Sequence, residues 1–189
     1  VIESFTAGDT FYVSEDTVLY AQWKKIITFD FTKVSALDDN IVLDGAGFKL
    51  YEYKGNSTPS GLVDESSSDW TPVDSGQTSD AAGEVSFLLK NAKAGSYYQL
   101  IETSAPTHFK LPTGQWLIKV NIGSSGDVTY DITKVNGTDG EVPPAFKLDS
   151  SNKYLLQNIP VVGLPAMGGN GTALYMLIGT SLVFVGLVF

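Results

Sequence analysis

The 189-residue sequence contains no cysteine and no arginine, and its single histidine is His108. Without cysteine the chain has no disulfide and no thiol chemistry, and with one histidine we expect neither a catalytic triad nor a histidine metal site. The 12 basic residues are all lysines and stand against 21 acidic residues, for a net charge of −9. A nucleic-acid surface needs clustered basic residues, so no nucleic-acid partner is expected. No cofactor is expected either.

Long helix-period patterns are also absent before the last segment, whereas aromatic residues, valine, threonine and glycine are plentiful. This composition predicts an all-β fold. Strands are expected at residues 26–34, 47–54, 84–90, 97–103, 115–122, 127–133 and 153–158. Seven short strands separated by turn residues are typical of a β-sandwich.

The strand patterns place one complete domain at residues 26–160, with polar loops at 55–80 and 134–145. Residues 1–25 hold two short strand patterns around a turn, which is too little to fold alone. The chain begins inside this segment and stops within an apolar run. We therefore expect it to be the C-terminal part of a longer surface protein.

A linker is predicted at residues 161–171, which are rich in glycine and proline. Residues 172–189 are almost wholly apolar, and we expect them to form a truncated membrane-spanning helix. A buried core helix is the alternative.

Three polar residues interrupt the apolar faces of the predicted strands. Lys33 follows Phe29 and Phe31 at alternate positions, Glu102 closes a similar apolar run, and Asn158 closes another. Side chains alternate between the two faces of a strand, so all three should point inward. An isolated buried charge is very costly and normally neutralises or finds a partner.

These residue types together suggest a reaction. Burial lowers the pKa of a lysine and raises that of a carboxyl group, so Lys33 could become a neutral amine and attack the side-chain carbonyl of Asn158. Glu102 would move the protons, and ammonia would leave. The chain would react once with itself and would not be a turnover enzyme. Strand alternation alone also fits a buried Lys33–Glu102 ion pair beside Asn158, or three partly exposed residues at strand ends.

Five segments of the domain, in order, resemble the Cna protein B-type domains of Gram-positive surface proteins and pilins. They are the lysine strand at 29–34, Leu-x-Gly-Ala-x-Phe-x-Leu-Tyr at 43–51, Asp-x-x-Gly-x-Val at 80–85, Tyr-x-Leu-x-Glu-Thr-x-Ala-Pro at 98–106, and the asparagine strand at 157–160. The resemblance implies a transthyretin-like or inverse immunoglobulin-like β-sandwich. It also implies an isopeptide bond between Lys33 and Asn158, with Glu102 as the catalyst. One departure is Thr107-His108-Phe109, where the family commonly has x-Gly-Tyr.

A second motif precedes the apolar run: Leu164, Pro165, Ala166, Met167 and Gly168 resemble the L-P-x-T-G sorting signal that sortase transpeptidases cut. Met167 replaces the usual threonine. The resemblance implies cleavage after Met167, with sortase and peptidoglycan as partners and anchoring to the cell wall at the bacterial surface. In the alternative, residues 172–189 simply stay in the membrane as the anchor.

Residues 19–23, Leu-Tyr-Ala-Gln-Trp, resemble the tail of a Listeria–Bacteroides repeat, although an ordinary hairpin would also fit. Two functions remain open. The first is a self-cross-linked stalk domain that carries a distal binding region away from the cell. The second is an adhesin module whose loops 55–80 and 134–145 recognise a host matrix protein or glycan. A polymerising pilin is less favoured, because no lysine motif of the pilin type is found.

Overall fold

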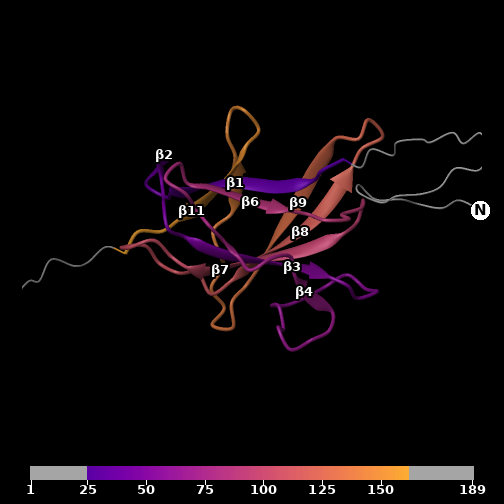
Figure 1. Cartoon of the computed structure of the whole chain (residues 1–189). Helices are drawn as coiled ribbons and strands as arrows, with labels where there is room; N and C mark the ends of the chain where they lie inside the picture. Colours follow the sequence, from indigo (N-terminus) through magenta and orange to yellow (C-terminus); the bar gives the residue numbers. More distant parts are fainter. Residues whose placement is uncertain (1–24, 162–189) are drawn as a thin grey trace, which may run out of the picture.

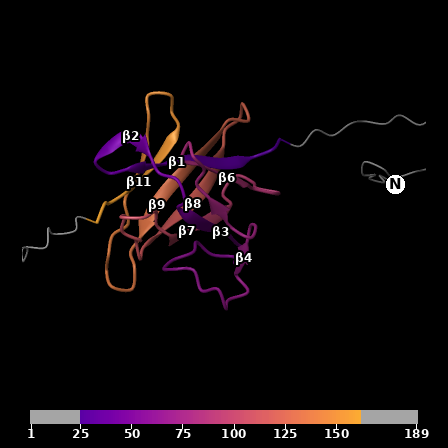
Figure 2. The same ribbon diagram turned by 60° about the vertical axis from the view of Figure 1, so that its left-hand side comes forward.

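The computed structural model describes residues 25–161, which form a sandwich of two β-sheets (Figures 1 and 2). Sheet A consists of β1 (Thr28–Ser35), β2 (Asp38–Val42), β6 (Glu84–Leu88), β10 (Phe146–Leu148) and β11 (Tyr154–Asn158). Sheet B consists of β3 (Gly47–Tyr53), β4 (Trp70–Pro72), β5 (Gln77–Thr78), β7 (Tyr97–Ser104), β8 (Gln115–Ile122) and β9 (Val128–Val135). The predicted all-β sandwich is confirmed.

The first and last long strands, β1 and β11, are direct neighbours in sheet A. They run parallel, with Phe31 opposite Tyr154 at one end of the pairing and Ser35 opposite Asn158 at the other. Every other pairing in the two sheets is antiparallel. Because β1 and β11 point the same way, the described chain starts at one end of the sandwich and leaves it at the other (Figure 1).

All seven predicted strands are present, with ends shifted by a few residues. The structure adds four short ones: β2, β4, β5 and β10. Every residue of β2 is exposed, so its sequence has no alternating pattern that could reveal a strand. The loop predicted at 55–80 contains two of these short strands, β4 at Trp70 and β5 at Gln77–Thr78.

The core lies between the sheets and is rich in aromatic rings. Phe29 and Phe31 of β1 are 0% and 1% exposed, and Phe29 packs edge-on against Tyr130 with ring centroids 5.0 Å apart. Trp116 of β8 is fully buried. His108 lies in a loop with a φ of 70°. A polar side chain at an inward strand position is therefore surrounded by buried aromatic rings and shielded from water.

Several predictions fall outside residues 25–161. They concern the repeat-like residues 1–24, the sorting motif at 164–168 and the apolar segment 172–189, of which nothing is described. Within the described range, the structure has no helix with the length and apolarity that crossing a bilayer requires.

Candidate cross-linking site

Lys33 continues the inward face of β1 after Phe29 and Phe31 and is fully buried. It stands where β1 changes partners, because β6 pairs with the strand as far as Thr32 and β2 pairs from Val34 onward. At this junction the backbone N–H of Lys33 donates to the carbonyl of Gly83 at 2.7 Å. The main chain that carries the lysine is therefore held by a turn as well as by strands.

Gly83 ends that turn and approaches the lysine backbone very closely. Its φ is +72°, and an added Cβ would lie 2.6 Å from the carbonyl oxygen of Lys33. Asp80 shapes the turn, since its Oδ1 accepts from the backbone N–H groups of Ala82 and Glu84. A glycine is required here both for its backbone conformation and for the space beside Lys33.

Asn158 and Glu102 reach the lysine from two different strands. On β11, Leu156 is the register partner of Lys33, and Asn158 follows it on the same inward face. On β7, Glu102 crosses from sheet B into the space between the sheets, paired with Phe48 of β3. Asn158 is 0% exposed and Glu102 is 3% exposed. The three predicted residues therefore meet in the interior.

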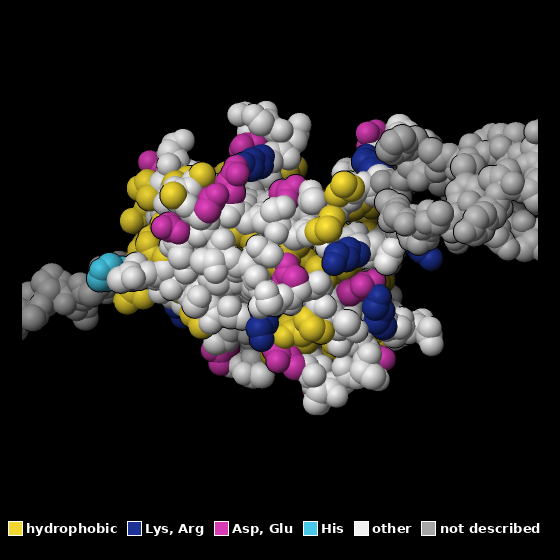
Figure 3. All heavy atoms as spheres, viewed as in Figure 1, with side chains coloured by type: hydrophobic (Ala, Val, Ile, Leu, Met, Phe, Trp, Pro, Cys, Tyr) yellow, Lys and Arg dark blue, Asp and Glu magenta, His cyan; other side chains and the backbone are white. Residues whose placement is uncertain are grey.

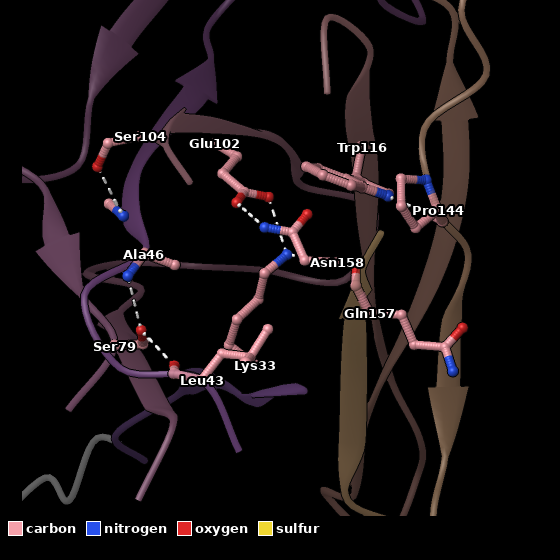
Figure 4. Close-up of polar contacts among 11 residues, drawn as sticks. Lys33, Leu43, Ala46, Ser79, Glu102, Ser104, Trp116, Pro144, Gln157 and Asn158 are labelled. Carbon is pink, nitrogen blue, oxygen red and sulfur yellow. Dashed lines mark hydrogen bonds and ion pairs between the residues drawn. The ribbon is translucent and has the colours of Figure 1, made fainter. Parts of the chain in front are cut away.

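The carboxyl group of Glu102 lies between the two nitrogens (Figure 4). Lys33 Nζ donates to Glu102 Oε2 at 2.8 Å, and Asn158 Nδ2 donates to Glu102 Oε1 at 2.8 Å. Lys33 Nζ also donates to the main-chain carbonyl of Gln157 at 3.3 Å and lies 5.5 Å from the centroid of the Phe48 ring. Asn158 Oδ1 is buried with no hydrogen-bond partner in the described part of the chain.

Burial sets the protonation of this group. Loss of water lowers the pKa of Lys33, an effect that the adjacent Glu102 carboxylate opposes. The same loss of water raises the pKa of Glu102, with Lys33 and the Asn158 hydrogen bond acting against it. In both residues burial is the largest cause. Burial therefore acts toward a neutral amine and a protonated acid, whereas the contact between the two groups acts toward an ion pair. A neutral amine next to a protonated acid is the combination that nucleophilic attack on an amide needs.

Sequence reasoning identified the three polar side chains but missed what surrounds them. Gly83 was noted only as part of a turn motif. The Gln157 carbonyl could not be foreseen, because any residue supplies such a group. The indole N–H of Trp116 was also missed; it donates to the carbonyl of Pro144 at 2.7 Å beside Asn158.

The surface shows no one-sided charge on the face drawn in Figure 3, where acidic and basic side chains are interspersed. Among residues 25–161 there is no group of three or more histidine, cysteine, aspartate or glutamate side chains that could hold a metal ion. The interior trio is thus the chemically distinctive feature of the described chain.

Comparison with known proteins gives one family match. The model of the SpaA prealbumin-like fold domain matches residues 28–138, which is more than half of the chain. No curated protein matches the chain.

Solved structures give distant likenesses. The pilus adhesin RrgA from Streptococcus pneumoniae is 23% identical with a TM-score of 0.49, over 75% of this chain and 16% of that one. A C-terminal fragment of the pilus adhesin SpaC from Lactobacillus rhamnosus GG is 22% identical with a TM-score of 0.41, over 75% and 48%. The C-terminal domain of the shaft pilin SpaA from the same organism is 18% identical with a TM-score of 0.37, over 72% and 99%. The chain therefore spans less than half of either adhesin chain.

Proposed function

The chain belongs to the family of SpaA prealbumin-like fold domains, and on that premise we propose that residues 26–160 are a stalk domain of a Gram-positive surface protein of the pilin or adhesin kind. The domain stabilises itself with an isopeptide bond between Lys33 and Asn158, made with the help of Glu102. The burial of these three side chains around one carboxyl group is the observation that carries the proposal.

Glu102 lies within reach of both nitrogens of this reaction, with Oε2 at Lys33 Nζ and Oε1 at Asn158 Nδ2. The neutral Lys33 amine attacks Cγ of Asn158, and Glu102 Oε2 accepts the proton that the new bond forces off Nζ. Glu102 Oε1 donates its proton to Asn158 Nδ2, the bond between Cγ and Nδ2 breaks, and ammonia leaves. The lysine loses a hydrogen, the asparagine loses its amino group, and Glu102 ends as it began. Each chain reacts once.

Such a bond would strengthen the domain in two ways. It closes a loop of about 125 residues, for which chain entropy predicts about 5 kcal/mol of added stability. It also joins the two parallel strands through which the chain enters and leaves. Tension along the chain would then pass through a covalent bond rather than through the hydrogen bonds of sheet A. This gives a cysteine-free protein a substitute for a disulfide.

Intact mass tests the proposal directly. The folded full-length chain should be lighter than its sequence by one ammonia, and a digest should yield one branched peptide joining residues 33 and 158. Lys33→Ala should have the full mass expected for its sequence. If the unaltered chain keeps its ammonia after folding, no bond forms and the trio is only a buried ion pair with a neighbouring amide.

The second part of the proposal is anchoring. Residues 164–168 would be cut by a sortase and joined to peptidoglycan, which requires expression in a Gram-positive host with its own sortase. Pro165→Ala should remove the chain from the wall fraction, and Met167→Thr should increase the amount released by a muramidase. If the chain remains in the membrane fraction and Pro165→Ala changes nothing, residues 172–189 are the anchor.

A binding role for the loops is the second candidate function. One observation favours it: residues 61–63 are held in place, because Gln99 Nε2 donates to the Gly61 carbonyl at 3.0 Å and the Val63 N–H donates to Gln115 Oε1 at 2.9 Å. A loop with a fixed shape can present a ligand-binding surface without ordering on contact. Glycan and matrix-protein arrays probed with the full-length chain test this role, and the absence of saturable binding on both contradicts it.

A further inference from the structure

A shallow hollow lies on the surface next to the Asn158 end of the site. It has no room for a water molecule, and its walls are Lys110, Pro112, Glu141, Pro144, Asn158 and Ile159. These residues come from the end of β11, from the segment after β7, and from the loop between β9 and β10. We call residues 136–145 of that last loop the covering loop.

Three residues outside the covering loop fasten it through their side chains. The Trp116 indole N–H donates to the Pro144 carbonyl at 2.7 Å, close to Asn158 in Figure 4. Thr113 Oγ1 donates to Asp139 Oδ1 at 2.6 Å. Lys110 Nζ forms an ion pair with Glu141 Oε1 at 3.0 Å. The loop is thus tied to the core at one point and to the neighbouring segment at two.

The packing beneath the covering loop is also tight. A Cβ at Gly114 would lie 2.5 Å from Pro143 Cδ, and one at Gly137 would lie 2.1 Å from Thr113 Oγ1. Both glycines therefore let the loop approach the segment below more closely than any other residue would allow.

Water at this position would compete with the lysine. Glu102 accepts a proton from an attacking amine, and it could take one from an attacking water molecule in the same way. Hydrolysis would add water across the amide of Asn158, release ammonia, and leave an aspartate at position 158. Water would also restore the charged forms of Lys33 and Glu102, because their shifted pKa values depend on burial.

We propose that the covering loop decides which nucleophile reaches Asn158: it keeps water out so that Lys33 reacts instead. This inference rests on the proposed cross-link. Since the hollow cannot hold even a water molecule, ammonia leaves only when the loop opens. The Lys110–Glu141 ion pair includes a lysine side chain that is 55% exposed, so the pair adds little stability and is a place where opening can start.

The test follows the two products during folding. The full-length chain is produced in insoluble, unfolded form, dissolved in denaturant before it has reacted, and folded for the first time by dilution into water enriched in oxygen-18, with mild detergent for its apolar end. Intact mass and peptide mapping then separate cross-linked chains, which lack one ammonia, from hydrolysed chains, which carry the heavy oxygen at position 158. Lys110→Met and Glu141→Gln should each raise the hydrolysed fraction by about fivefold, the size expected when one surface ion pair is lost.

Lys54→Met is the matched control. It breaks the Lys54–Glu52 ion pair, whose atoms are 2.7 Å apart and whose lysine side chain is 50% exposed, at the edge of sheet B. The hydrolysed fraction should stay at the level of the unaltered chain. Trp116→Phe keeps most of the ring and removes the donor to Pro144, and it should raise hydrolysis as well.

Two results overturn the inference. One is cross-linking of the loop variants at the normal rate with no heavy oxygen. The other is slower cross-linking, still with no heavy oxygen, because the loop would then only position the strand. A failure of the cross-link itself is recognised separately, since in that case the unaltered chain would lose no ammonia in the same experiment.

Discussion

Gln99 and Glu102 both lie on β7 and are both buried, but they point to opposite faces of sheet B. Glu102 faces the other sheet and contacts Lys33 and Asn158. Gln99 faces outward, where its amide donates to Gln115 Oε1 at 2.5 Å and to the carbonyl of Gly61. In each cluster one amide oxygen is buried without a hydrogen-bond partner in the described chain: Oδ1 of Asn158 and Oε1 of Gln99.

The two clusters therefore share burial, amides and an unpaired oxygen, yet only the inner one contains groups that titrate. The outer cluster consists of neutral side chains and backbone groups, and its effect is to hold residues 61–63 against the sheet. The inner cluster adds an amine and a carboxyl group whose pKa values burial moves toward their neutral forms. Burial of polar groups alone does not make a reactive site. An acid and a base must be desolvated together.

Glu102→Gln should break this contrast most strongly, because it turns the inner cluster into a neutral amide cluster like the outer one. Without a carboxyl group to move protons, no ammonia should be lost, and intact mass will show this. The variant should also be less stable by about 5 kcal/mol, the stability expected from closing the long loop. Chemical denaturation measures the difference. A Glu102→Gln chain that still loses ammonia would show that Glu102 is not the catalyst.

Lys33→Met should isolate the effect of burial on Glu102. The ordinary pKa of this carboxyl is 4.5, and burial raises it in the folded state. At pH values between 4.5 and the raised pKa of the folded state, the folded chain holds a proton that the unfolded chain has lost. The free energy of unfolding is therefore highest at low pH and falls as pH rises above 4.5. The slope approaches about 1.4 kcal/mol for each pH unit.

Denaturation midpoints of Lys33→Met measured from pH 4 to pH 8 will check this dependence. The double variant with Glu102→Gln is the control and should lose the extra slope. A Lys33→Met chain whose stability does not fall across this range would mean that Glu102 is solvated rather than buried.

Gly83→Ala should damage the inner cluster without touching its three side chains. The new Cβ would meet the Lys33 carbonyl oxygen at 2.6 Å in a backbone conformation with positive φ. We expect a loss of about 2 kcal/mol and slower cross-linking, followed by mass during refolding. Gly95→Ala is the control, because its φ is +85° and nothing lies within 4 Å of the new Cβ. Equal cross-linking rates in the two variants would exclude a positioning role for Gly83.

Gln99→Leu should have the smallest effect and should leave the inner cluster intact. It removes the hydrogen bonds to Gln115 and Gly61, for a loss of about 1 kcal/mol. Amide hydrogen exchange at Val63 should become faster, while the mass still shows the loss of one ammonia. A Gln99→Leu chain that fails to cross-link would mean that the two faces of β7 are coupled.

Strand alternation predicted that the three side chains of the inner cluster point inward, and the family resemblance predicted that they meet. Lys33, Glu102 and Asn158 each occupy a position that a two-residue period assigns to the core, and all three are buried there. The combination of strand-forming residues, turn signals and, in some segments, alternation predicted the seven longer strands. It failed for β2, which is exposed at every position, and for β10, which has only three residues. Where burial does not alternate, the sequence has no strand signal.

The outer cluster and the turn at Gly83 depend on contacts that no local pattern encodes. Residues 61–63 were predicted to lie in an exposed loop, but they bind the glutamine side chains of sheet B through their own backbone carbonyl and N–H groups, which every sequence supplies. Gly83 stood in a recognisable turn motif, yet its contact with Lys33 joins segments that are far apart in the chain. Such contacts follow from the tertiary fold.

The parallel pairing of β1 with β11 has a consequence for length. A bond from residue 33 to residue 158 would leave only the few residues on either side of it in series with an applied pull. The residues between 33 and 158, including both loops and all of sheet B, would lie outside the path of the force. Unfolding of these residues would not lengthen the chain under load, so a series of such domains would transmit an applied force without extending.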